Sequence, residues 1–198
     1  MPSLKYNNDI ITESAIVAQF LVDSHPSHLV KSSSEPGGPI QRARINFFVD
    51  AFFSKVNPLF HKALWNANAE DNGSALQAFV DAVVKEIEPL LEDAGPFFGG
   101  SERLTLAEVW NSDTSSTGEI LSNKQVLTGS FLLRILSFPK YGGPLPLSIL
   151  TDLETKAPRF WKWANAVVKE NSVNYIYDEE RVAKKTLERI AQNNAAKK

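Results

Sequence analysis

The chain has 198 residues, of which 43% are hydrophobic and 22% charged, and this ordinary globular composition excludes disordered, collagen-like and coiled-coil classes. Lys and Arg number 21 against 23 Asp and Glu, so there is no basic excess for binding nucleic acid. The absence of cysteine excludes disulfides and thiolate chemistry, and no apolar run approaches 18 residues. We therefore expect a cytoplasmic protein that uses no metal and binds neither nucleic acid nor membranes.

The first elements are short. Residues Pro2–Tyr6 and Ile10–Thr12 alternate as two strands around an Asn/Asp turn, and they predict a hairpin. A helix should start with Ser14 as its N-cap and stop at His25–Pro26, because the residue before a proline disfavours helix. The apolar positions with helical spacing are Ile16, Val17, Phe20 and Leu21.

A linker follows at residues 32–38, a Ser/Gly/Pro-rich run with few side chains that could pack. Beyond it, a long helix is predicted from Pro39 to about Trp65, with Pro58 as the expected site of a kink. Almost the whole of residues 39–198 has helical periodicity. The sequence therefore predicts a mainly α protein with an all-α bundle over 39–198, preceded by two strands and a helix over 1–31.

Two capping boxes are expected in the helical part. Ser74 with Gln77 should open one helix, and Thr105 with Glu108 should open another. Further helices are expected through Phe131–Leu136, from Ser148, from Pro158 and over Asp178–Ala191.

These elements, taken in order, resemble the glutathione transferases. Pro2, a short hairpin and Glu13-Ser14 at the mouth of a helix are similar to the end of the family's thioredoxin-like lobe, which a linker joins to an all-α domain. Residues 97–108 contain FFGG and TLAE, which resemble the family's F-x-x-G and S/T-x-A-D element, with Glu in place of Asp. APRFWKW at residues 157–163 resembles the family's P-x-L-x-x-W helix, and this stretch of sequence is most similar to fungal, omega-like members.

The resemblance implies a glutathione site. Met1, before a cis Pro2, would offer backbone hydrogen bonds to the cysteinyl part, and Glu13 and Ser14 would bind the γ-glutamyl end. A helix N-terminus can accept a carboxylate, and Glu13 complements an ammonium group. The implied co-substrates are glutathione and a small electrophile, the implied role is detoxification, and the implied assembly is a possible homodimer.

The resemblance also implies that a strand, a helix and a strand precede Met1 and carry the catalytic Ser, Tyr or Cys. We therefore expect the chain to be truncated and to have no catalytic residue, with conjugation or thiol transfer belonging to the full-length form. One alternative is a non-catalytic interaction module of transferase-like fold, which would ignore glutathione. Another is a non-functional isoform with exposed apolar helix faces.

The polar segment NSDTSSTGEILSNK interrupts an expected helix at residues 111–124. Joining Glu108 to Val126 restores an unbroken helical pattern, and the 17 residues removed are 109–125. This insertion is predicted to be either an intron read in frame, since a Val codon begins with GT and a Gln codon can end in AG, or a surface loop.

Other candidate site residues have simpler interpretations. His25, His28 and His61 have no ligand-like spacing, so they are interpreted as solvent or cap residues. Three arginines could meet an anionic ligand between the lobes, although solvated helix charges are commoner. They are Arg42, Arg44 and Arg134. The aromatic stripe Phe48, Phe52, Phe53 and Phe60 is interpreted as mainly core.

Overall fold

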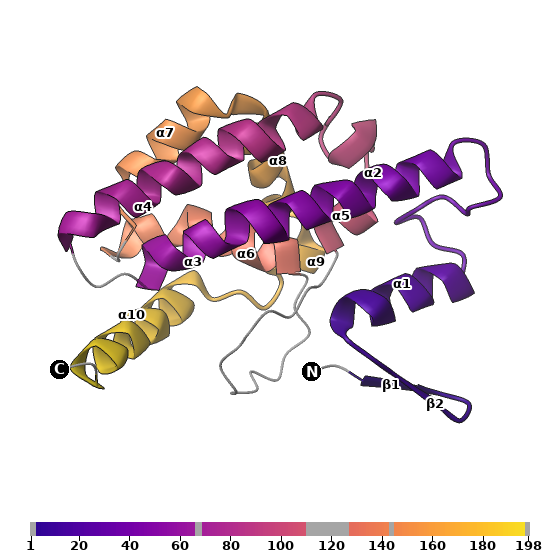
Figure 1. Cartoon of the computed structure of the whole chain (residues 1–198), viewed down its shortest axis with the longest axis horizontal. Coiled ribbons are helices and arrows are strands. Elements are labelled where there is room, and N and C mark those ends of the chain that lie inside the picture. The colour runs from indigo at the N-terminus through magenta and orange to yellow at the C-terminus, as the bar shows by residue number, and fades with distance from the viewer. Residues whose placement is uncertain (1–2, 66–68, 110–126, 143–144, 197–198) are drawn as a thin grey trace.

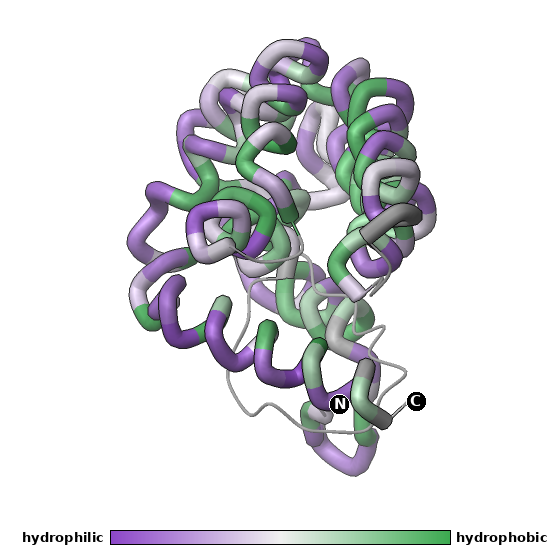
Figure 2. The backbone as a smooth tube through the Cα atoms, turned by 90° about the vertical axis from the view of Figure 1, so that its left-hand side faces the viewer, coloured by the Kyte–Doolittle hydropathy of each residue, from purple (hydrophilic) through white to green (hydrophobic). Residues whose placement is uncertain are grey.

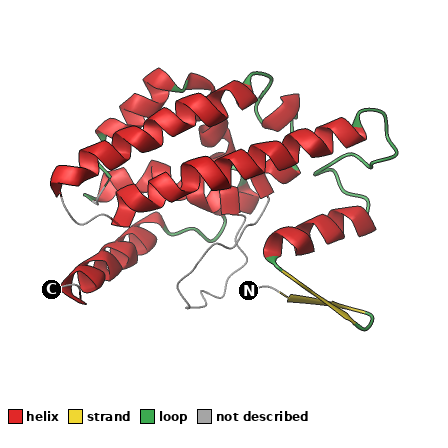
Figure 3. Ribbon diagram, in the orientation of Figure 1, coloured by secondary structure: helices red, strands yellow, loops and turns green. Residues whose placement is uncertain are grey.

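The structure is a computed structural model that describes residues 3–65, 69–109, 127–142 and 145–196. The predictions for Met1, Pro2 and almost all of the expected insertion fall outside these residues. Helices make up most of the described chain, and a single hairpin provides its strands (Figure 3). This architecture confirms the mainly α fold class that the periodicity predicts.

The predicted hairpin is present at the start of the described chain. Strands β1 (Ser3–Tyr6) and β2 (Asp9–Thr12) pair antiparallel. Asn7 has a positive φ of 54°, which suits the tight turn between them because asparagine tolerates the left-handed region. The ring of Tyr6 packs edge-on against Phe20 of the following helix, with centroids 5.0 Å apart. The hairpin is thereby fixed to that helix.

Helix α1 (Ser14–Ser24) includes Ser14 itself, so it begins one residue earlier than predicted. The N-cap position belongs to Glu13 and not to Ser14, so the prediction that Ser14 caps the helix is wrong. At the other end, His25 is extended before Pro26, as expected for a residue that precedes proline. Figure 1 shows the hairpin and α1 at one end of the molecule, below the helical bundle.

The first long helix consists of α2 (Gly38–Ala51), a π-helical turn (Phe52–Val56) and α3 (Asn57–Trp65). The predicted disturbance at Pro58 takes the form of this wide turn. A proline cannot donate to the carbonyl four residues earlier and its ring clashes with that carbonyl, so the preceding turn opens to i→i+5 bonding.

The second long helix, α4 (Ala69–Ala82), begins five residues before the predicted capping box. Ser74 is an exposed residue within the helix, and Gln77 donates to Asp81 at 2.7 Å instead of reaching back to a cap. The Ser74 capping box is therefore wrong. A Ser-x-x-Gln pattern on a solvent-exposed helix face has the same spacing as a cap, so the local pattern alone did not separate the two.

A second π-helical turn (Val83–Ile87) follows α4 and passes into a 3-10 turn (Glu88–Leu91) that contains Pro89. In both long helices, the wide turn ends two residues before the proline. The two wide turns pack against each other in the middle of the bundle.

The helix predicted to open at Thr105 is divided into two parts. Helix α5 (Leu106–Val109) starts at the capping box, and α6 (Leu127–Ser137) packs against it. The Thr128 hydroxyl donates to the Ala107 carbonyl at 3.3 Å, which joins the end of one helix to the start of the other.

The remaining helical segments complete the bundle, and α10 extends five residues further than the Asp178–Ala191 pattern predicts. These segments are the 3-10 turns Phe98–Gly100 and Phe138–Tyr141 and the helices α7 (Ser148–Lys156), α8 (Pro158–Lys169), α9 (Asn171–Asn174) and α10 (Glu179–Ala196).

An aromatic cluster lies at the centre of the bundle. The rings of Phe60 and Phe131 are 4.4 Å apart, and Phe48 contacts both Phe98 and Trp163. Hydrophobic and hydrophilic residues alternate along the helices (Figure 2), which gives each helix one face for this core. The interpretation of the Phe48 and Phe60 stripe as core is confirmed.

Candidate functional site

Glu13 lies at the junction of β2 and α1 and has an unusual backbone. Its φ is 69° and its ψ is 120°, a region that residues other than glycine rarely occupy. Holding a residue in this region costs about 1–3 kcal/mol, so the surrounding structure must enforce the conformation. Such residues are found mainly at active sites, ligand clamps and switch regions. The side chain of Glu13 is exposed, so its carboxylate is available to solvent or ligand.

The N-terminus of α1 follows directly. The first intrahelical bond runs from the Val17 N–H to the Glu13 carbonyl at 2.9 Å, so the N–H groups of the three residues before Val17 precede the helical ladder. Glu13 makes no side-chain capping bond, and the first turn of α1 contains no acidic residue. Free N–H groups and the positive end of the helix dipole together favour a carboxylate at this position.

The four residues predicted to bind glutathione are thus only partly placed. Glu13 and the backbone of Ser14 lie side by side at this junction, whereas the side chain of Ser14 lies outside the described part of the chain. Met1 and Pro2 lie outside it as well. The structure describes a cis peptide bond at Gly95–Pro96, in the loop before α5.

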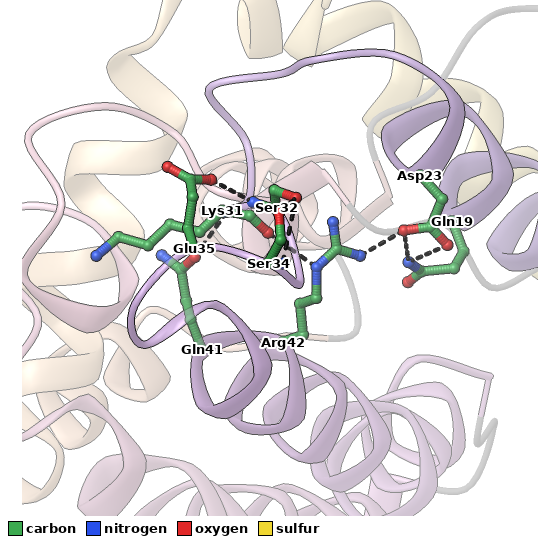
Figure 4. A network of polar contacts seen from close by, with 8 residues as sticks. All are labelled: Gln19, Asp23, Lys31, Ser32, Ser34, Glu35, Gln41 and Arg42. Carbon is green, nitrogen blue, oxygen red and sulfur yellow. Dashed lines mark hydrogen bonds and ion pairs between the residues drawn. The ribbon is translucent and has the colours of Figure 1, made fainter.

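A polar network holds α1 against α2 (Figure 4). Arg42 of α2 forms an ion pair with Asp23 of α1, and its Nε donates to the Lys31 carbonyl at 2.8 Å. The Gln41 side chain accepts a bond from the Lys31 N–H at 2.8 Å. Arg42 is therefore neither free for a ligand nor simply solvated, because it ties α1 and Lys31, the residue before the linker, to α2.

Glu108 joins the two motifs that carry the resemblance in the helical part. Its carboxylate is completely buried and accepts two bonds of 2.7 Å from Thr105, one from the N–H and one from the hydroxyl. It also accepts a bond from the Phe98 N–H at 2.9 Å and one from the Trp163 indole N–H at 2.8 Å. The Thr105–Glu108 capping box is confirmed, and its link to Trp163 is a contact that the sequence pattern did not reveal.

The other candidates have different surroundings. Arg44 pairs with Asp93 at 2.7 Å on the surface. Arg134 is half-buried in α6, so the interpretation as a solvated charge does not hold for it. All three histidines reach the surface, as interpreted, although neighbouring groups partly desolvate the imidazole of His61. Among the described residues, no group of three His, Cys, Asp or Glu could hold a metal ion, and no helix has the length and apolar character needed to cross a membrane.

Comparison with known proteins bears on the fold. No family model and no curated protein matches the sequence. Glutathione transferase Omega 3C from Trametes versicolor matches with a TM-score of 0.63 and 16% identity over 96% of this chain and 71% of its own. A rice glutathione transferase, solved in complex with glutathione, matches with a TM-score of 0.63 and 21% identity over 94% of this chain and 74% of its own.

Glutathione transferase Omega 1C from Trametes versicolor is a further match, with a TM-score of 0.61 and 22% identity over 92% of this chain and 67% of its own. This chain has the glutathione-transferase fold. The matches include both Omega-type proteins and the rice transferase, so they support the resemblance that the Glu13-Ser14, TLAE and Trp163 motifs indicate. Within the glutathione-transferase fold, the β2–α1 junction is the strongest candidate site, because it combines a constrained acidic residue with an open helix N-terminus.

Proposed function

We propose that the chain binds glutathione at the β2–α1 junction. The observation that carries the proposal is the positive φ of Glu13 at the mouth of an uncapped helix, within the glutathione-transferase fold. The α1 N-terminus would receive the carboxylate of the γ-glutamyl end, and the Glu13 carboxylate would pair with its ammonium. Met1, Pro2 and Ser14 are proposed as the remaining contacts on the strength of the resemblance.

The chemical step is proposed for the full-length form that the resemblance implies. That form would conjugate glutathione to a small electrophile or transfer its thiol, as a cytoplasmic protein of detoxification. The sequence of this chain has no cysteine, so a cysteine nucleophile is not among its residues. For this chain we propose binding without turnover, with residues 1–31 as a remnant of the thioredoxin-like lobe, 32–38 as the linker and 39–198 as the helical domain.

A homodimer is part of the same proposal. Ile40 and Phe47 are 63% and 62% exposed on α2. They are two helical turns apart and therefore lie on one face of the helix. A second copy covering this face would remove both side chains from water.

Equilibrium titration of the chain with glutathione tests the site. Cysteinylglycine serves as the comparison ligand because it lacks the γ-glutamyl end. We expect glutathione to bind the parent more tightly than cysteinylglycine, and Glu13→Ala to weaken glutathione about tenfold or more while leaving the dipeptide unchanged. Asp9→Ala is the matched control, since it removes an exposed carboxylate from the same hairpin.

Equal affinity of the parent for the two ligands, or equal losses in the two variants, would overturn the proposed site. A folded, monodisperse chain that binds neither ligand would instead favour the non-catalytic interaction module.

A further inference from the structure

Helix α1 meets the helical bundle at its C-terminal end, whereas the proposed glutathione site lies at its N-terminal end. Val22 packs against the hydrophobic core of the bundle, and Asp23 forms the ion pair with Arg42 of α2. In the N-terminal half of the helix, Ile16 is 57% exposed. Ten residues, or almost three helical turns, separate Glu13 from Asp23.

The side-chain charges of α1 do not complement its dipole. A helix is stabilised by acidic groups in its first turn and by basic groups in its last turn. The first turn of α1 contains no acidic residue, and its last turn contains Asp23 and no basic residue. The negative end of this helix therefore carries a negative side chain, which destabilises the helix unless a cation lies beside it.

Arg42 provides that cation from α2 (Figure 4). Its side chain is only 17% exposed, and its Nε bond to the Lys31 carbonyl holds the guanidinium in place beside Asp23. Gln19, one turn earlier in α1, donates to both carboxylate oxygens of Asp23 at 2.9 Å. The charge at the C-terminal end of α1 is thus compensated by the bundle, and the positive N-terminal end is left for the carboxylate of a ligand.

The N-terminal elements depend on such contacts for their stability. Isolated helices shorter than about 12–15 residues are marginal in water, and so is a single two-stranded hairpin. Helix α1 has 11 residues, and each strand of the hairpin has four. Undocking of α1 from the bundle therefore competes with docking, and any group that binds the docked helix shifts this equilibrium.

We propose that α1 couples the ligand at its N-terminus to the Asp23–Arg42 pair at its C-terminus, so that Arg42 is a positioning residue for glutathione binding. The ligand carboxylate and the ion pair stabilise opposite ends of the same helix, so each strengthens the other. This inference rests on the proposed glutathione site. It adds to that site a residue of the helical domain that acts through α1 instead of contacting the ligand.

Titration of charge-reversal variants with glutathione tests the coupling. Arg42→Asp and Asp23→Arg each place like charges together, so each should weaken glutathione binding about fivefold or more. The double reversal restores an ion pair and should return the affinity to within about twofold of the parent. Arg44→Asp is the matched control, because it breaks the pair between α2 and Asp93 without involving α1, and it should leave the affinity unchanged.

Hydrogen exchange gives a second readout, which follows the coupling along the helix. In the parent, glutathione should slow exchange of the Leu21 and Val22 amides as well as those next to Glu13. In Arg42→Asp, the protection of Leu21 and Val22 should be lost. Protection that is confined to the first turn of α1 in the parent would contradict the coupling.

The outcomes separate the coupling from the binding site. A parent chain that does not bind glutathione refutes the proposed site and the coupling with it. A parent that binds glutathione, together with single reversals of unchanged affinity, refutes the coupling alone. A double reversal that binds as weakly as the single reversals also refutes it, because the loss would then not depend on the ion pair.

Discussion

Deleting residues 110–126 should stabilise the protein, because a hydrogen bond already joins the flanking helices α5 and α6 between residues that one continuous helix would pair after the deletion. The Thr128 hydroxyl donates to the carbonyl of Ala107, 21 positions earlier in the sequence. In a continuous helix, a threonine hydroxyl makes this bond to the carbonyl four residues before it. Removing 17 residues reduces the spacing to four. Because residues 109 and 126 are both valine, deleting 109–125 or 110–126 leaves the same sequence.

The magnitude follows from loop closure and helix ends. Closing a loop of this length costs roughly 2.5 kcal/mol of chain entropy, from (3/2)RT ln n. Joining α5 to α6 also pairs backbone groups that both helix ends leave outside the helical ladder. We expect the free energy of unfolding to rise by about 2–3 kcal/mol and the melting temperature by about 5–10 °C. Urea and thermal unfolding, followed by circular dichroism and tryptophan fluorescence, measure both.

A deletion of 110–125 is the matched control, since it removes one residue fewer. The extra residue rotates α6 by about 100° relative to α5 and turns the buried side chains of Leu132 and Ile135 away from the core. This variant should be less stable than the parent. The reasoning is refuted if the 17-residue deletion does not stabilise the chain, or if both deletions have the same effect.

Three further predictions concern single side chains. In Glu108→Gln, the new amide NH₂ faces hydrogen-bond donors that the buried carboxylate accepts in the parent. Urea unfolding should show that this variant loses about 2–4 kcal/mol of unfolding free energy, whereas the exposed control Glu154→Gln should lose less than about 0.5 kcal/mol. The pKa of His61 is lowered by burial and then by Arg134, so the unfolded state takes up more protons there and stability should fall as the pH falls below about 6.5. This acid slope should be shallower in His61→Gln; identical slopes would exclude His61 as its source. Arg42→Gln breaks the pair with Asp23, which should raise hydrogen exchange in α1 and cost less than about 1 kcal/mol overall, and unchanged exchange would show that the pair does not hold α1.

The sequence predicted the elements whose signals are local. The Asn7 turn, the stop before Pro26 and the Thr105–Glu108 box each depend on residues within a few positions of one another, and all three are present. A local signal also gave a wrong prediction where two different structures share the same sequence pattern. The Ser74 box has capping spacing, yet it lies on the exposed face of a helix that had already begun.

The sequence pattern did not predict properties that depend on contacts between distant parts of the chain. The burial of Arg134 results from the packing of α6 against other helices, and a helical pattern does not distinguish such an arginine from a solvated one. The link from Glu108 to Trp163 spans 55 residues, so the motifs appeared as separate signals. The positive φ of Glu13 has no signature in residue type, because glutamate ordinarily avoids that region.

The most direct test of glutathione binding is an amide-resolved NMR titration of the chain with glutathione. We predict that the largest shifts fall on the N–H groups of Glu13, Ser14 and Ala15, because the helix N-terminus receives the γ-glutamyl carboxylate there. Glu13→Ala should reduce these shifts at the same ligand concentration. Shifts that are absent, or that map to residues away from the β2–α1 junction, would contradict the account.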